Sequence, residues 1–360
     1  MAGPSTLGDF LLQRGISRRG FMKFCTAMAS AMAMPPSFAR DMAANLETAK
    51  RQSVIWLSFQ ECTGCTESLT RSHSPTLESL IFDFISLDYH HTLQAASGHA
   101  AEKAREEAME RAGEGGYLVV VDGSIPTGAG GAYSTIAGMT NLQMLAETLE
   151  NAAAVVSVGT CAAFGGIPYA DPNPTDARSV ESLMANGHVP SKPLINVSGC
   201  PPVPVVISGT FAHYLTFGQI PELDHYNRPK AFFGDTIHDR CYRRPFYDQG
   251  KMAKSFDDEG ARKGWCLYEV GCKGPTTYNA CATAKWNNGT SFPIESGHGC
   301  LGCSEPNFWD AGSFYKPLSA GMWGEAEGLA AAAAVGVAAG AGAAWGHRRR
   351  HAQAQEESQS

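Results

Sequence analysis

All of the eleven cysteines except Cys25 fall in three groups between residues 62 and 303, and their spacing limits the possible folds more than any other feature. The first group opens with Cys62-x-x-Cys65, which directly follows the β-rich run 54–59. Cys161 and Cys200 each lie just beyond another apolar run. Ligands of open parallel sheets bind outside the carboxyl ends of the strands, so we expect these four sulfurs to meet at one site. Four thiolates suit either zinc or a [4Fe–4S] cluster.

The apolar runs that precede these cysteines predict the fold of the first half. Residues 117–122 form a continuous apolar run bounded by glycines, which is typical of a fully buried parallel strand. Residues 153–159 and 194–198 repeat this pattern, and helix-like stretches lie between the runs at 100–112 and 139–149. This alternation predicts an α/β domain over residues 50–225, built on a doubly wound parallel sheet of the flavodoxin-like kind.

The chain changes character at Asn227. Regular periodicity fades, and Gly, Pro, Asn, Cys and aromatic residues dominate until Pro317. We therefore expect a smaller, irregular domain over residues 226–317, in which bound inorganic clusters supply the missing core. Its potential ligands form two groups, His238 with Cys241, Cys266 and Cys272, and Cys281 with Cys300 and Cys303.

The first 39 residues have the features of an export signal. The run from Ser17 to Lys23 reads S-R-R-G-F-M-K, an apolar stretch follows at 24–34, and small residues lie before Ala39. A charged start, a short apolar stretch and a small-residue cleavage site make a signal peptide. The arginine pair resembles a twin-arginine signal, which exports proteins already folded. We expect cleavage after Ala39, with Ala44 as the alternative.

The opposite end predicts a membrane anchor. Residues 328–346 contain no charged residue, and His-Arg-Arg-Arg-His follows at 347–351. A stretch of this length is about enough to cross a bilayer as a helix rising ~1.5 Å per residue. Its low content of Leu, Ile and Phe leaves an Ala/Gly-rich linker as the alternative. The basic cluster favours a cytoplasmic tail at 347–360 and a body on the periplasmic side of the membrane.

Disulfides and zinc are the alternatives to cluster binding. Ten cysteines in an exported protein could form five disulfides. That interpretation leaves the twin-arginine signal unexplained, and the cysteines of each C-x-x-C pair are too close for an easy, unstrained bridge. Structural zinc suits a site with four ligands and fits the group of three cysteines poorly. A protein exported folded can keep thiolates that bound metal in the reducing cytoplasm.

The motifs around the cysteines resemble those of the [NiFe] hydrogenase small subunit. In chain order they are C-T-G-C at 62–65, G-T-C-A-A-F-G-G at 159–166, V-S-G-C-P-P at 197–202, H-D-R-C at 238–241 and G-H-G-C-L-G-C-S-E-P-N-F-W-D at 297–310. The resemblance spans about residues 50–317, and the signal and tail match the membrane-bound uptake class. It implies ligand sets that use all ten cysteines: a proximal [4Fe–4S] cluster on Cys62, Cys65, Cys161 and Cys200, a distal [4Fe–4S] cluster on His238, Cys241, Cys266 and Cys272, and a medial [3Fe–4S] cluster on Cys281, Cys300 and Cys303.

Three further positions follow from the resemblance. Pro293 resembles the proline that stands where a fourth cysteine would complete the medial cluster, and proline has no side-chain ligand atom. Gly64 and Gly166 match the positions at which oxygen-tolerant members of the family have two extra cysteines around the proximal cluster. We therefore expect an ordinary proximal [4Fe–4S] cluster and an oxygen-sensitive enzyme.

The same resemblance implies an electron-transfer role. Dihydrogen would be split at a nickel–iron centre in a separate large subunit, so no catalytic residue is expected in this chain. Electrons would pass through the proximal, medial and distal clusters and leave near His238. The acceptor would be a membrane cytochrome b with quinone, or a cytochrome c.

Two other functions compete with this one. The related quinone-reducing complex I subunit uses adjacent cysteines and lacks the second domain, whereas Cys62 and Cys65 are separated here. A disulfide-rich, membrane-anchored binding protein is the alternative from a different class. The formal charge of −7, without a basic run in the body, excludes nucleic-acid binding.

Other polar residues have no assigned ligand role. Arg240, Arg243 and Arg244 lie beside His238, either as a solvated basic face or as part of the exit surface for electrons. Four histidines of the α/β half have no ligand spacing, and we expect them on the surface: His73, His90, His91 and His99.

Overall fold

The computed structural model describes residues 17–31, 34–48, 51–73, 75–111 and 116–318. Its centre is a five-stranded, wholly parallel sheet in the order β2-β1-β3-β7-β9. This is the flavodoxin-like order, so the prediction of a doubly wound sheet is confirmed. The strands are β1 (Gln52–Ser58), β2 (Ile85–His90), β3 (Tyr117–Asp122), β7 (Ala152–Val158) and β9 (Leu194–Val197).

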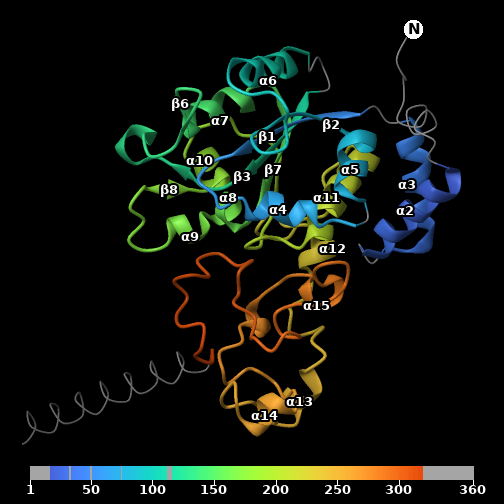
Figure 1. The fold of residues 1–360 in the computed structure, drawn as a ribbon, viewed down its shortest axis with the longest axis vertical. Helices are drawn as coiled ribbons and strands as arrows, with labels where there is room; N and C mark the ends of the chain where they lie inside the picture. Colours follow the sequence, from blue (N-terminus) through green and yellow to red (C-terminus); the bar gives the residue numbers. More distant parts are fainter. Residues whose placement is uncertain (1–16, 32–33, 49–50, 74, 112–115, 319–360) are drawn as a thin grey trace, which may run out of the picture.

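Helices cover both faces of this sheet (Figure 1). Alternate side chains of β1 enter two separate cores, Val54 and Trp56 on one face and Ile55 and Leu57 on the other. The first core is closed by α4 (Gly64–Thr70) and α11 (Pro204–Phe217). The second is closed by α6 (His99–Arg111), α7 (Asn141–Leu149) and α10 (Val180–Ala185). Burial on both faces explains why the central strands are continuous apolar runs.

Short elements fill the connections of the α/β half. Helix α7 begins two residues later than predicted, because Thr140 caps its first turn and Met139 pairs with Ile136 in a hairpin. The short elements are α5 (Leu77–Ser79), the π-helical η1 (Leu80–Phe84), the β4 (Ile125–Pro126) and β8 (Ala177–Arg178) pair, the 3-10 turn η3 (Gly128–Gly131), the β5 (Thr135–Ile136) and β6 (Met139–Thr140) hairpin, α8 (Thr160–Phe164) and α9 (Gly166–Tyr169).

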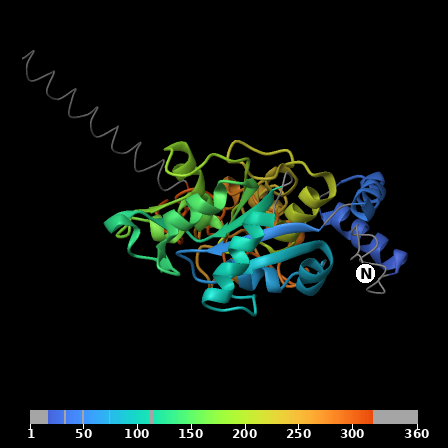
Figure 2. The ribbon, with the colours of Figure 1, turned by 90° about the horizontal axis from the view of Figure 1, so that it is seen from above.

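Two N-terminal helices pack against the α/β half. Helix α2 (Arg18–Ala31) and helix α3 (Pro36–Thr48) contact each other and α11. Phe21, Cys25 and Met28 of α2 are buried in the first core. Figure 2 shows this pair (blue) at one end of the molecule.

Residues from Asn227 to Leu318 form an irregular region beyond the carboxyl edge of the sheet (Figure 1). It has a small apolar core that includes Ile237, Leu267 and Phe292. Arg228, fully buried, ties this region to the α/β half through Asp224 (2.8 Å) and Glu305 (2.9 Å). Its regular elements are α12 (Lys230–Phe233), α13 (Arg244–Asp248), α14 (Glu259–Arg262), the 3-10 turn η4 (Gly274–Thr276) and α15 (Cys281–Ala284).

Among the described residues, no helix has the length and apolar character needed to span a bilayer. The predicted anchor at 328–346 and tail at 347–360 lie outside the described residues, as do the first 16 residues of the predicted signal.

Candidate metal centres

Four cysteines from three segments of the chain meet at the carboxyl edge of the sheet. Cys62 follows β1, Cys65 lies in α4, Cys161 lies in α8 and Cys200 follows β9. Burial raises the pKa of the Cys161 thiol to about 11. Burial, followed by the charges of neighbouring cysteines, raises the pKa of Cys200 to about 12. Thiols of this kind become thiolates when a bound cation compensates their charge.

Glycines make room around these sulfurs. A Cβ at Gly159 would lie 2.4 Å from Cys65 Sγ, and one at Gly166 would lie 2.6 Å from Cys161 Sγ. Both glycines have positive φ, +92° and +60°, which side chains rarely adopt. The backbone therefore approaches both sulfurs closely, and in this structure a side chain at either glycine would require the neighbouring sulfur to move.

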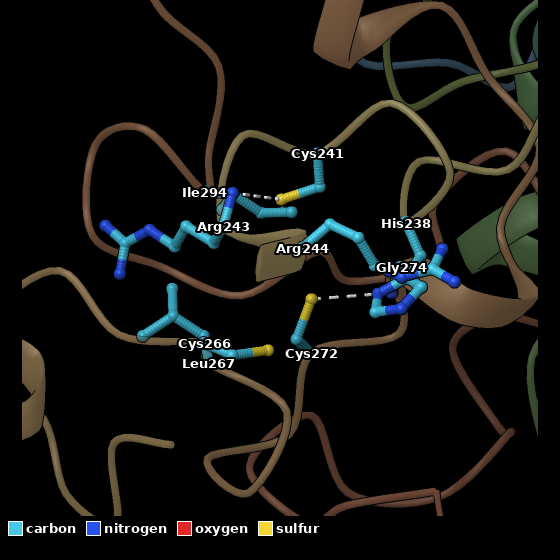
Figure 3. A pocket seen from close by; sticks show the side chains of 9 residues that line it. All are labelled: His238, Cys241, Arg243, Arg244, Cys266, Leu267, Cys272, Gly274 and Ile294. Atoms are coloured by element: carbon cyan, nitrogen blue, oxygen red, sulfur yellow. Dashed lines mark hydrogen bonds between the residues drawn. The ribbon is translucent and has the colours of Figure 1, made fainter. Parts of the chain in front are cut away.

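The second predicted group surrounds one small pocket (Figure 3). His238, Cys241, Cys266 and Cys272 all line it, with the sulfur atoms directed toward the shared space. Burial, together with the charge of Arg244, lowers the pKa of His238 and so favours its neutral form. A neutral imidazole is the form that can bind a metal.

Backbone amides donate to the sulfurs of this second group. Arg243 N–H donates to Cys241 Sγ over 3.4 Å. Cys272 Sγ accepts two such bonds, from Gly274 N–H (3.4 Å) and from Cys300 N–H (3.3 Å). Donors placed in this way stabilise negative charge on sulfur.

The third predicted group lies between the other two. Cys281 begins α15, and burial raises its pKa well above the ordinary value, with the charges of Cys303 and Cys300 adding to the effect. Cys300 accepts from Gly302 N–H over 3.4 Å. Pro293 is exposed, between the buried Phe292 and Ile294, and its carbonyl accepts from His298 N–H (2.9 Å).

The donor chemistry of these groups favours iron–sulfur clusters. All eleven cysteines are described, and each is a free thiol. Within the described ranges, no three His, Cys, Asp or Glu side chains are placed to hold a single metal ion. Soft sulfur donors, four in the first group and three in each of the other two, with the His238 imidazole in the second, suit clusters of iron and sulfide.

A buried polar network behind the first group was missed by the sequence analysis. His90 is fully buried and its ring lies against that of Trp56 (centroids 5.0 Å apart), so the expectation that it lies on the surface was wrong. Thr66 joins His90 (3.4 Å) to Asp122 (3.3 Å). Burial lowers the pKa of His90 to about 4 and raises that of Asp122 to about 7. One signal was available, because Asp122 ends an apolar strand at the edge that holds the cysteines.

The three arginines beside His238 differ from one another. Arg240 is exposed and pairs with Asp235 (2.7 Å), and Arg244 pairs with Asp248 (3.1 Å). Arg243 is buried and donates to the backbone carbonyl of Trp265 (2.9 Å). Arg243 therefore does not belong to a solvated basic face, and the other two have their charge balanced.

A doubly wound sheet with thiol groups at its carboxyl edge, extended by a cysteine-rich region, defines an iron–sulfur protein of the electron-transfer class. Two family models match the chain. One, described as NADH ubiquinone oxidoreductase, 20 Kd subunit, covers residues 62–214. The other, described as the C-terminal part of the NiFe/NiFeSe hydrogenase small subunit, covers residues 233–316.

Relatives that align along most of the chain show which family the whole chain belongs to. The uptake hydrogenase small subunit of Azotobacter vinelandii is 46% identical over 89% of this chain and 87% of its own. The periplasmic [NiFe] hydrogenase small subunit 1 of Nitratidesulfovibrio vulgaris is 48% identical over 87% of this chain and 98% of its own. A solved [NiFeSe] hydrogenase chain of Dm. baculatum, 36% identical, superposes with a TM-score of 0.69 over 75% of this chain and all of its own. The chain belongs to the [NiFe] hydrogenase small-subunit family.

Proposed function

We propose that this chain is the electron-transfer subunit of a [NiFe] hydrogenase, working as a heterodimer with a large subunit that holds the nickel–iron centre. The observation that supports this most directly is the gathering of ten cysteines and His238 into three adjoining donor groups. Each cluster would accept and release one electron. The chain's own part is to hold the clusters, to shield them from water and to donate hydrogen bonds to their sulfurs.

The proposed ligand sets are the three that the family resemblance implies. The proximal [4Fe–4S] cluster is held by Cys62, Cys65, Cys161 and Cys200; the distal [4Fe–4S] cluster by His238, Cys241, Cys266 and Cys272; and the medial [3Fe–4S] cluster by Cys281, Cys300 and Cys303. The amide donors to Cys241, Cys272 and Cys300 favour the reduced, more negative state of the clusters.

Metal analysis of the co-purified heterodimer tests this proposal. We expect about eleven iron atoms in this subunit, four for each [4Fe–4S] cluster and three for the [3Fe–4S] cluster, with nickel only in the partner. The isolated chain should not oxidise hydrogen. Hydrogen uptake by a homogeneous preparation of this chain alone, or the absence of acid-labile sulfide, would contradict the assignment.

We also propose export by the twin-arginine route and retention at the periplasmic face of the membrane by residues 328–346. Replacing Arg18 and Arg19 together by lysine should leave the heterodimer in the cytoplasm. Deleting the chain from Leu329 onward should release soluble enzyme that still reduces an artificial dye with hydrogen. Normal periplasmic activity of the lysine variant would refute the export route.

The proposed acceptor is a membrane cytochrome b with quinone, or a cytochrome c.

The glycines at positions 64 and 166 support the proposal that air inactivates this enzyme. Without the two extra cysteines, the proximal cluster has four thiolates only, as in an ordinary [4Fe–4S] centre. Sustained hydrogen turnover under atmospheric oxygen would contradict this proposal.

A further inference from the structure

Arg243 is a buried cation at the second cysteine group. It is 6% exposed and lines the same small pocket as the ligands of that group (Figure 3). Its backbone N–H donates to Cys241 Sγ (3.4 Å). Its guanidinium donates through Nη1 to the carbonyl of Trp265 (2.9 Å), the residue before Cys266. The main chain and the side chain of one residue thus join two segments that carry cysteines of this group.

The hydrogen bonds of the Arg243 guanidinium go to neutral acceptors. Besides the Trp265 carbonyl, its Nε donates to the hydroxyl of Tyr242 (2.8 Å). Within the described ranges, the carboxylates near this pocket pair with Arg240 and Arg244, and none forms an ion pair with Arg243. A buried charge is costly unless an opposite charge lies near it. The negative charge available to Arg243 is therefore that of the thiolates which share its pocket.

The thiols of this pocket respond to that cation. Burial raises the pKa of each of the three, and the charge of Arg243 acts on each in the opposite direction: Cys241, Cys266 and Cys272. A fixed positive charge at this position favours any state of the site that carries more negative charge.

We propose that Arg243 tunes the distal cluster: its buried guanidinium stabilises the reduced state of the cluster and so raises the midpoint potential. This inference rests on the proposed ligand sets. Reduction adds one negative charge to the cluster, and the net charge around a cluster is one of the factors that set its potential. A higher potential makes the distal cluster a better acceptor for electrons from the medial cluster.

The chain offers a matched control in Arg240, which directly precedes Cys241. Its Nε donates to the Asp235 carboxylate (2.7 Å), and its Nη2 pairs with the same carboxylate (2.7 Å). Its side chain is 60% exposed, so Asp235 and solvent compensate its charge. Replacing either arginine by glutamine removes one positive charge and two polar contacts. A general effect of losing an arginine beside Cys241 would therefore appear in both variants.

The test compares Arg243→Gln, Arg243→Lys and Arg240→Gln in the purified heterodimer. Glutamine removes the charge, whereas lysine keeps the charge without the planar guanidinium. The midpoint potential of the distal cluster is measured by redox titration of its reduced paramagnetic signal, which magnetic coupling to the ligating nitrogen of His238 distinguishes from the signal of the proximal cluster.

Removal of the charge should lower this potential. Unit charges about 10 Å apart at an effective dielectric constant of about 20 change an equilibrium constant roughly tenfold. We therefore expect Arg243→Gln to raise the ratio of oxidised to reduced cluster at a fixed potential about tenfold, which is a midpoint about 59 mV lower for a one-electron couple. Arg243→Lys and Arg240→Gln should titrate like the unchanged protein.

An unchanged potential in Arg243→Gln, or an equal shift in either of the other two variants, would overturn the proposal. Iron analysis shows whether each variant holds the distal cluster. Loss of this cluster from Arg243→Gln alone would also support a role for the charge. Its loss from Arg243→Lys as well would show that the site needs the shape of the guanidinium, and would overturn the proposal. If the unchanged heterodimer has no reduced cluster coupled to an imidazole nitrogen, the ligand sets themselves are refuted.

Discussion

Alanine at position 159 should remove the proximal cluster while the fold remains. The backbone of Gly159 has φ +92° and ψ +153°, a region that is essentially restricted to glycine and costs other residues about 1–3 kcal/mol. The added Cβ would lie 2.4 Å from Cys65 Sγ, whereas ordinary contacts begin at 3.4 Å. The sulfur must therefore move by about 1 Å, and metal–ligand bonds tolerate only about 0.2 Å.

Iron and acid-labile sulfide analysis of the heterodimer measures this loss. We expect Gly159→Ala to hold about seven iron atoms in this subunit in place of about eleven, because a [4Fe–4S] cluster without the Cys65 ligand is not retained. Gly64→Ala is the matched control, since Gly64 begins helix α4 and its added Cβ would lie 3.2 Å from Cys62 Sγ, a contact that a small shift relieves. Full iron content in Gly159→Ala, with an unchanged signal from the reduced proximal cluster, would refute the reasoning.

Three further changes test other parts of the molecule. Pro293→Cys should convert the medial centre to four irons and lower its potential, seen as about one additional iron atom and loss of the three-iron signal; an unchanged signal would show that Pro293 does not stand at the open ligand position. Burial raises the pKa of Asp122 from 3.8 to about 7, so the folded protein holds this proton more tightly than the unfolded chain does. The free energy of unfolding should therefore fall as pH rises from about 4 to about 7. Asp122→Asn should flatten the fall in Tm between pH 5 and 8, and an identical pH profile would contradict this. Arg228→Met leaves Asp224 and Glu305 without their shared cation and should destabilise the protein by about 3 kcal/mol, measured by urea unfolding, whereas an unshifted midpoint would show that the pairs contribute little.

The central strands could be located from the sequence because their environment is uniform along the strand. The run 117–122 is buried on both faces, and its bounds agree with those of β3. Helix α11 was missed because it is apolar on almost every side, so its sequence shows no 3.6-residue period that would indicate a helix. Strand β2 was also missed. It lies at the edge of the sheet, where half-buried positions such as Leu87 and Asp88 obscure the strand pattern.

Six cysteines of the candidate site could be found from spacing, because they follow predicted strands or form C-x-x-C pairs: Cys62, Cys65, Cys161, Cys200, Cys300 and Cys303. The other four were assigned through the family resemblance. His90 could not be found in this way. Its place in the buried network depends on Thr66 and, through Thr66, on Asp122, and a lone histidine has no sequence feature that identifies such partners.

The proposed cleavage point lies inside a packed helix. Ala39 is 3% exposed and within α3, so the bond to Arg40 belongs to backbone that is already hydrogen-bonded. A peptidase acts on locally opened chain, and its rate then follows how often the segment opens. Removal of α2 would also take away Met28, whose methyl group lies beside Gly209 of α11. The rate of cleavage would thus depend on how often the N-terminal helices open. Cleavage would also expose an apolar face of α11 that α2 covers in the uncleaved chain.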